Sequence, residues 1–207
     1  MARYPTSVLQ GTAAQALATV LLHHLPQDKG PYKVLDPCYG KGHWWDARLS
    51  NDYHVHPSDI LPPWNQDVRR LFADRPDMVG AFDAVVYDPP YLVGTGNTDD
   101  PREGDYGGYA HSEFDLLSYI NALSGLVLML KPNGVLIVKC QDQYVVPERK
   151  LHLWHADWLV ELDACDVDVV DFYVYPYHRA SPTAYQVKDR PCAVVGHSYL
   201  LVARRLG

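Results

Sequence analysis

One short segment joins an acid, two prolines and an aromatic ring: D-P-P-Y, residues 88–91, directly after the apolar run at 81–87. Proline has no N–H for a β-ladder, so a buried strand is expected to end here. The corner offers the carboxylate of Asp88, the carbonyl of Pro89 and the aromatic face of Tyr91. The two oxygens can each accept one N–H of an amine on a planar ring, and the tyrosine can stack on that ring.

A second segment, V-L-D-P-C-Y-G-K-G at 34–42, is a short apolar strand that enters a glycine turn. Gly40 and Gly42 let the backbone turn tightly and let a ligand approach closely. The pattern is neither G-x-G-x-x-G nor a Walker loop, which disfavours dinucleotides and triphosphates. Asp36 could accept from an ammonium group, and Asp59 stands where an acid typically takes ribose hydroxyls. Taken alone, the turn could equally be a plain connection between strand and helix.

The elements that would position these residues alternate between strand and helix. Helical spacing or glycine-turn patterns occur at 11–25, 38–50, 66–75, 113–130 and 152–164, the third of them as a short helix or loop. Strand patterns occur at 32–37, 52–60, 81–88, 132–142, 167–177 and 192–205. This order predicts an α/β fold with a mostly parallel sheet and an antiparallel strand near its end. The long loops at 92–112 and 177–191 are candidates for substrate contact.

Bulk composition narrows the class of protein. The 207 residues suit one domain, and 47% hydrophobic with 21% charged residues is ordinary for a globular chain. No apolar run approaches the roughly 20 residues of a membrane span, and the N-terminal residues 1–10 lack the apolar core of a signal peptide, so we expect a cytoplasmic protein. The net charge of −7 argues against strong unaided attraction to phosphates. The four cysteines form no C-x-x-C pair, and His54 with His56 supplies only half a zinc site, so we expect no metal.

The two constellations together resemble a known family. V-L-D-P-C-Y-G-K-G with V-V-Y-D-P-P-Y-L is similar to the S-adenosylmethionine-dependent amino methyltransferases that modify adenine N6 or cytosine N4 in DNA. G-V-L-I-V-K-C-Q-D and S-Y-L-L-V-A-R-R resemble small DNA-methylase-like proteins of bacteria and phages. The resemblance implies a Rossmann-like class I methyltransferase fold with helices on both faces of the sheet. It also implies a single domain, 1–207, without a separate target-recognition domain.

The resemblance assigns roles to particular residues. The catalytic motif corresponds to Asp88, Pro89, Pro90 and Tyr91. The positions implied for S-adenosylmethionine are Thr12 at a helix start, Asp36, Cys38, Gly40, Gly42, Asp59 and Asp67. We add three substrate candidates: Tyr109, in the loop after the catalytic motif, could stack on a base, Lys139 ends a strand at the expected site edge, and Arg179 is a basic residue of the loop 177–191. If the substrate is duplex DNA, the target base must leave the helix to reach Asp88.

Several functions stay open at this point. D-P-P-Y is commoner among adenine enzymes and S-P-P-Y among cytosine enzymes, which favours adenine N6 in DNA. Cytosine N4, an RNA base or a protein amide are alternative targets of the same chemistry. A different class is a non-catalytic partner subunit with the same fold, against which the intact motifs argue. Because the chain is acidic, a homodimer or a partner subunit could supply the affinity for nucleic acid.

Overall fold

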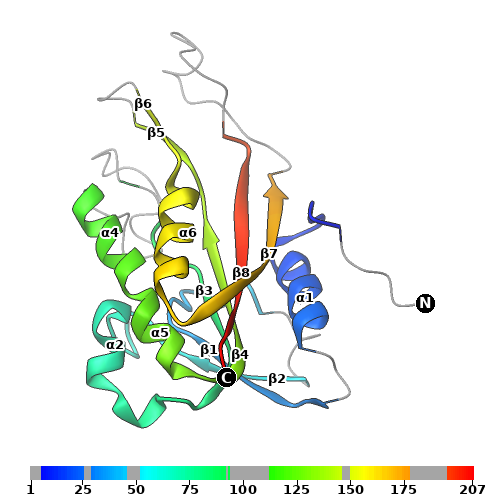
Figure 1. Ribbon diagram of the computed structural model, residues 1–207, viewed down its shortest axis with the longest axis vertical. Helices are drawn as coiled ribbons and strands as arrows, with labels where there is room; N and C mark the ends of the chain where they lie inside the picture. Colours follow the sequence, from blue (N-terminus) through cyan, green and yellow to red (C-terminus); the bar gives the residue numbers. More distant parts are fainter. Residues whose placement is uncertain are drawn as a thin grey trace.

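The computed structural model describes residues 6–25, 29–45, 52–91, 93, 112–145, 150–177 and 195–207. Its centre is a six-stranded sheet with the order β2-β1-β3-β4-β8-β7 (Figure 1). The strands are β1 (Tyr32–Asp36), β2 (Tyr53–Pro57), β3 (Phe82–Tyr87), β4 (Leu130–Cys140), β7 (Val167–Pro176) and β8 (His197–Arg205). β1 to β4 pair in parallel, and β8 runs antiparallel to β4 and β7. The predicted mixed α/β sheet is confirmed.

Helices cover both faces of the sheet, each over its own apolar cluster. α1 (Ala13–His24) lies on one face and buries Leu17 and Leu21 among residues of β1, β3 and β8. On the other face lie α2 (Val68–Asp74), the 3-10 turn η2 (Pro76–Met78), α4 (Glu113–Asn121), α5 (Leu123–Met129) and α6 (Trp154–Ala164) (Figure 1). Among the described helices, none has the length and apolar character needed to cross a membrane.

One predicted helix is wrong in detail. The run 113–130 is not one helix, because a tight turn at Ala122, whose N–H donates to the Tyr119 and Ile120 carbonyls, separates α4 from α5. In the predicted turn and helix over 38–50, hydrogen bonds from Gly42 to Tyr39 and from Trp45 to Gly42 form successive turns up to residue 45, and 46–50 lie outside the described residues. The hairpin of β5 (Gln143–Val145) and β6 (Lys150–His152) was not predicted.

Along the edge strand β7, the side chains switch from one face of the sheet to the other at a bulge. Its register against β8 skips one residue between Val169 and Asp171, which is a β-bulge. Because side chains alternate along a strand, one extra residue moves all later side chains to the opposite face. Val167 therefore packs in the cluster under α6, whereas Tyr173 and Tyr175 pack in the cluster under α1.

Candidate active site

The register of β3 and β4 brings Asp88 and Lys139 together. Tyr87 pairs with Val138, so the next residues of the two parallel strands are neighbours at their carboxyl ends. The Lys139 Nζ lies 3.1 Å from each carboxylate oxygen of Asp88 and 4.7 Å from the centre of the Tyr91 ring. Burial is the largest single influence on the pKa of Lys139 and lowers it, but Asp88, Tyr91 and Tyr177 act together to raise that pKa above its ordinary value. Lys139, predicted as a substrate contact, is therefore a cationic partner of the D-P-P-Y corner.

Trp44 supplies a further contact that the sequence did not indicate. Its indole Nε1–H donates to Asp88 Oδ2 over 2.6 Å, and the Lys139 Nζ lies 5.1 Å from the centre of its ring. The sequence predicted that this carboxylate accepts an N–H from an amine on a planar ring. In the structure it accepts an N–H from the planar ring of Trp44. The signal available in the sequence was the W-W pair directly after the glycine turn, but a contact across 44 positions has no local pattern.

The glycine turn after β1 is tied to the end of β2. Gly40 N–H donates to Asp59 Oδ2 over 2.7 Å, and Leu61 N–H donates to Asp59 Oδ1 over 2.8 Å. Gly40 and Gly42 have φ values of 53° and 71°, in the region that favours glycine. At Gly42 an added Cβ would come within 2.6 Å of the Tyr39 hydroxyl. Both glycines are therefore required by backbone conformation, and Gly42 also by lack of space.

Asp36, at the end of β1, is a buried acid with two donors. Its carboxylate accepts from the Cys38 N–H at 3.1 Å and from the Trp45 Nε1–H at 2.7 Å. Burial raises the pKa of Asp36 to about 7; Asp88 and Asp59 raise it too, while the two hydrogen bonds act the other way. Such a carboxylate would be stabilised in its ionised form by a nearby cation.

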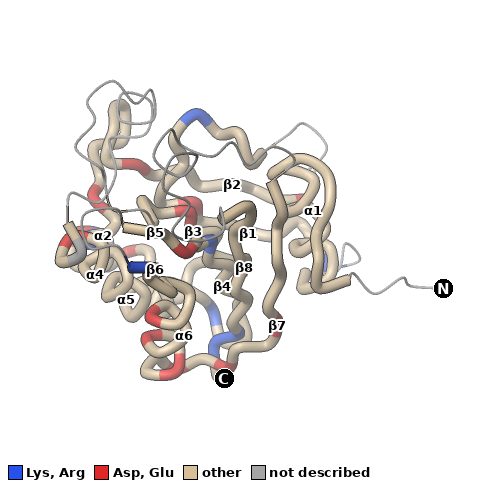
Figure 2. Tube along the Cα trace, turned by 90° about the horizontal axis from the view of Figure 1, so that it is seen from above, with Lys and Arg blue, Asp and Glu red and all other residues tan. Residues whose placement is uncertain are grey.

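Four of the predicted acids lie around one thiol. The pKa of Cys38 is raised first by burial and then by the carboxylates of Asp36, Asp59, Asp88 and Asp67. The structure thus brings together acids from the ends of three neighbouring strands and the start of α2. In the end-on view of Figure 2, acidic and basic positions meet beside the β3 label. This end of the sheet is the usual ligand site of open α/β sheets.

Two predicted cofactor residues have structural roles of their own. Asp67 is the N-cap of α2, accepts from the Arg69 N–H and pairs with the Arg69 guanidinium at 2.7 Å. Thr12 is the N-cap of α1 in a reciprocal capping box with Gln15, as its position at the helix start predicted. Tyr109 and Arg179 lie outside the described residues.

Two side chains missed by sequence reasoning hold the neighbouring chain segments. The Gln143 side chain exchanges two hydrogen bonds of 2.8 Å with the backbone of Val93, which fixes the chain shortly after D-P-P-Y. The Tyr177 hydroxyl donates to Gln141 Oε1 over 2.7 Å, beside the start of the β5–β6 hairpin. These bonds hold the segment after Tyr91 and the segment that follows Lys139.

Comparison with solved structures identifies the fold. The 1,6-didemethyltoxoflavin-N1-methyltransferase of Burkholderia thailandensis, solved with bound 1,6-didemethyltoxoflavin and S-adenosylhomocysteine, matches with a TM-score of 0.54 and 16% identity over 94% of this chain and 79% of its own. A SAM-dependent methyltransferase of Archaeoglobus fulgidus matches with a TM-score of 0.51 and 13% identity over 93% and 94%. The chain has the Rossmann-like methyltransferase fold, as predicted.

A proposed DNA modification methylase of Thermus thermophilus matches with a TM-score of 0.48 and 21% identity over 69% of this chain. The chain spans about half of that protein, since 52% of its length is covered. No protein-family model and no curated protein matches the chain.

Proposed function

We propose that the protein transfers a methyl group from S-adenosylmethionine to an exocyclic amine of a nucleobase, with adenine N6 in DNA as the leading substrate. The observation that supports this most directly is the set of contacts made by the Asp88 carboxylate. Its carboxylate lies beside the Tyr91 ring and Lys139, and already accepts a hydrogen bond from a planar aromatic N–H donor, Trp44. The exocyclic N–H of a base has the same donor chemistry and would replace that of Trp44.

The chain's own residues would act by orientation. Asp88 would accept one N–H of the amine and the Pro89 carbonyl the other, which draws the nitrogen lone pair out of conjugation with the ring. Tyr91 would stack on the base, and Lys139 would hold the carboxylate in place. The lone pair would then be directed at the methyl group that the cofactor supplies, and one N–H proton of the amine would leave to solvent. Positioning and fixed charges would supply most of the rate.

The residues present fit the cofactor. S-adenosylmethionine supplies an activated methyl group on a cationic sulfur. The buried Asp36 carboxylate, destabilised by burial and by two neighbouring acids, would gain from a positive charge beside it. Gly42 adopts a φ of 71°, a turn conformation that lets a ligand come close to the backbone. In this proposal Asp36, Cys38, Gly40 and Gly42 hold the methionine part and Asp59 the ribose. The helix start at Thr12 meets the methionine carboxylate, and Asp67 meets the adenine ring.

The decisive experiment measures methyl transfer from labelled S-adenosylmethionine to unmethylated duplex DNA, single-stranded DNA and RNA, followed by nucleoside analysis. We expect N6-methyladenine in DNA, and a loss of at least about 100-fold in Asp88→Asn because a fixed acceptor is removed. The matched control is Asp83→Asn. Asp83 lies on β3 and pairs with a lysine, Lys131, at 2.6 Å, but at the amino end of the strand.

Each other outcome has a definite meaning. N4-methylcytosine or a methylated RNA base would keep the mechanism and replace the substrate. Equal loss in both variants would contradict a special role for Asp88. A protein that binds no S-adenosylmethionine by calorimetry would support the non-catalytic partner subunit.

A further inference from the structure

We propose that His23, His24 and Asp171 form a site for a divalent transition metal ion such as Zn²⁺, on the far side of the sheet from α6. The potential ligand atoms of these three side chains all lie within 4.8 Å of one another. Asp171 Oδ2 is 3.0 Å from His24 Nε2 and 3.8 Å from His23 Nε2. This site is independent of the proposed methyl transfer.

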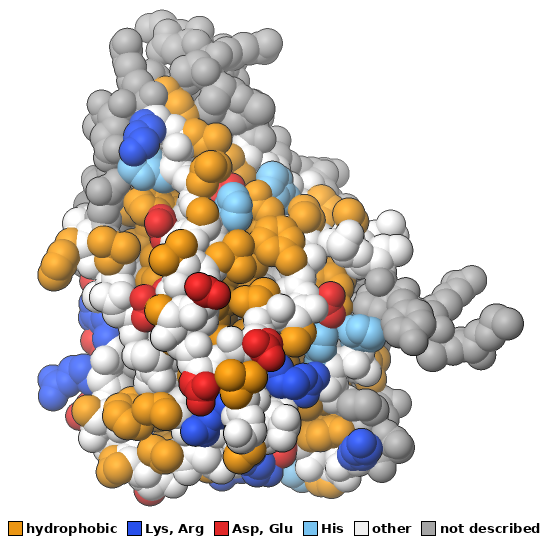
Figure 3. Space-filling model, in the orientation of Figure 1, with side chains coloured by type: hydrophobic (Ala, Val, Ile, Leu, Met, Phe, Trp, Pro, Cys, Tyr) orange, Lys and Arg blue, Asp and Glu red, His pale blue; other side chains and the backbone are white. Residues whose placement is uncertain are grey.

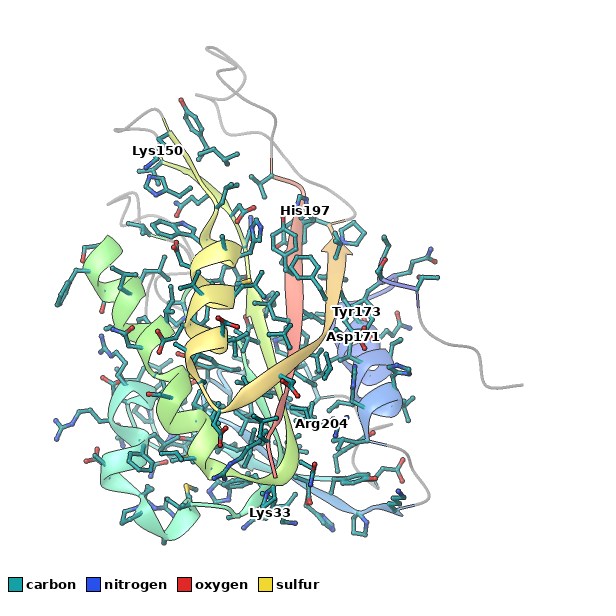
Figure 4. The ribbon with its side chains drawn as sticks, in the orientation of Figure 1. Lys33, Lys150, Asp171, Tyr173, His197 and Arg204 are labelled. Carbon is teal, nitrogen blue, oxygen red and sulfur yellow. The ribbon has the colours of Figure 1, made fainter. Side chains whose placement is uncertain are left out.

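The convergence depends on two features of the backbone. The histidines form the last turn of α1, and the bulge in β7 turns Asp171 to the face that α1 covers. Without the extra residue, Asp171 would face α6. Figure 3 shows histidine and acidic side chains gathered on the surface at this junction, and Figure 4 shows Asp171 and Tyr173 on β7 beside α1. Bulges are frequent where a strand must re-aim a side chain.

The donor set suits zinc or a similar ion. Two imidazole nitrogens and one carboxylate oxygen are the ligands of many three-residue zinc sites, with a fourth position left for water. Bonds of about 2.0–2.1 Å would place ligand atoms roughly 3.3 Å apart. The distances from Asp171 Oδ2 to the two histidines, 3.0 and 3.8 Å, are close to this value. The side chains of His23 and Asp171 are 30% and 37% exposed, so the fourth position would open to solvent.

Two neighbouring residues, Tyr173 and Arg204, affect how a cation would bind here. Asp171 Oδ2 also lies 3.2 Å from the Tyr173 hydroxyl, which donates to it, so three polar groups meet at one oxygen. A metal ion would take over two of these contacts and leave Tyr173 to orient the carboxylate. The charge of Arg204 acts on His24, so we expect moderate rather than tight affinity.

Metal binding would fasten α1 to the sheet edge at both ends. At its amino end, the segment before α1 already pairs with β7, through hydrogen bonds of 2.8 Å from Leu9 to Val174 and from Val174 to Ser7. The proposed site lies at the carboxyl end of the same helix. The expected consequence is a more stable protein in the presence of the metal.

The test titrates the chelator-treated full chain with Co²⁺, followed by its visible d–d bands, and with Zn²⁺ in competition with a chromophoric chelator. We expect one ion per chain, with affinity reduced at least tenfold in His23→Gln and in Asp171→Asn. The matched controls are His54→Gln, on the opposite edge strand β2, and Asp168→Asn, on β7 before the bulge. Both side chains are exposed and should leave binding unchanged.

Thermal unfolding of the same five proteins separates lost binding from lost folding. Zn²⁺ should raise the melting temperature of the wild type and of the two controls, and not that of His23→Gln or Asp171→Asn. The proposal is overturned if the wild type binds neither ion, or if the variants at the cluster bind as tightly as the controls. Loss of binding in His54→Gln alone would assign the metal to another histidine group.

Discussion

At the scale of single residues, Asp88 depends on Lys139 for charge compensation. Replacing Lys139 by Met keeps the aliphatic stem and leaves the carboxylate without its cation. We expect activity to fall by about 100-fold, since only Trp44 then orients the acceptor, and stability to fall by about 3 kcal/mol because a largely buried charge is unpaired. Denaturant unfolding measures the change in stability, and the methyl-transfer assay measures the change in activity.

The comparison for this variant is Lys131→Met. Lys131 pairs with Asp83 at 2.6 Å on the same two strands, but its side chain is 45% exposed. Loss of such an exposed pair should cost less than about 1 kcal/mol and leave activity intact. Equal effects of the two substitutions would refute the importance given to Lys139.

Asp36 should make stability depend on pH. Its pKa is about 7 in the folded protein, mainly through burial, against 3.8 as the ordinary value. The folded state therefore binds the proton more tightly, so this contribution to stability is complete below pH 3.8 and is lost as pH rises through about 7. Relative to Asp36→Asn, the wild type should lose about 2–3 kcal/mol of unfolding free energy between pH 5 and 8.

Unfolding curves of both proteins at several pH values check this. Asp36→Asn also changes the acceptor of Trp45, but that loss is common to all pH values and cancels in the comparison. Parallel pH profiles would show that Asp36 does not titrate in this range.

At the scale of elements, the contribution of the α1 capping box to folding stability can be measured separately. Thr12→Ala removes the acceptor for the Gln15 N–H and should cost about 1 kcal/mol. Thr19→Ala in the same helix removes only a bond to the Gln15 carbonyl within the helix, and alanine is the better helix former, so it should be neutral or stabilising. Chemical denaturation of the two variants distinguishes these results.

Gly42, in the turn after β1, and Gly80 allow the cost of a steric clash to be separated from the cost of backbone strain. Gly42 and Gly80 have similar φ values, 71° and 63°, but an added Cβ meets Tyr39 at Gly42 and no atom within 4 Å at Gly80. Gly80→Ala should therefore cost about 1–2 kcal/mol from the left-handed conformation alone. Gly42→Ala should cost more and weaken S-adenosylmethionine binding in calorimetry, whereas Gly80→Ala should not change that binding.

The sequence predicted the strands well because buried parallel strands are continuous apolar runs that end in turn residues. It did not predict the break at Ala122, since the apolar pattern of 113–130 continues through it. The acids at the strand ends were predicted from their order along the chain. Trp44 as a partner of Asp88, and Asp171 as a partner of two histidines, were not, because both contacts join distant segments and one depends on a bulge.

At the scale of the whole molecule, the net charge of −7 limits how the protein could hold DNA. Few neutralised phosphates release few counterions, so the slope of log Kobs against log salt should be shallow, about −3 or smaller in magnitude. Fluorescence anisotropy with a duplex at several salt concentrations measures this slope. A steep slope would require basic surface contributed by a second chain or by segments outside the described residues.

The bulge in β7 also has a consequence for how the molecule unfolds. Because β7 contributes Val167 to one apolar cluster and Tyr173 to the other, one continuous backbone is anchored in both layers. Pulling the strand away from β8 would expose both clusters at once, so neither layer could melt while the other remains intact. The two halves of the fold should therefore be lost in a single cooperative transition, with the edge strand acting as the coupling between them.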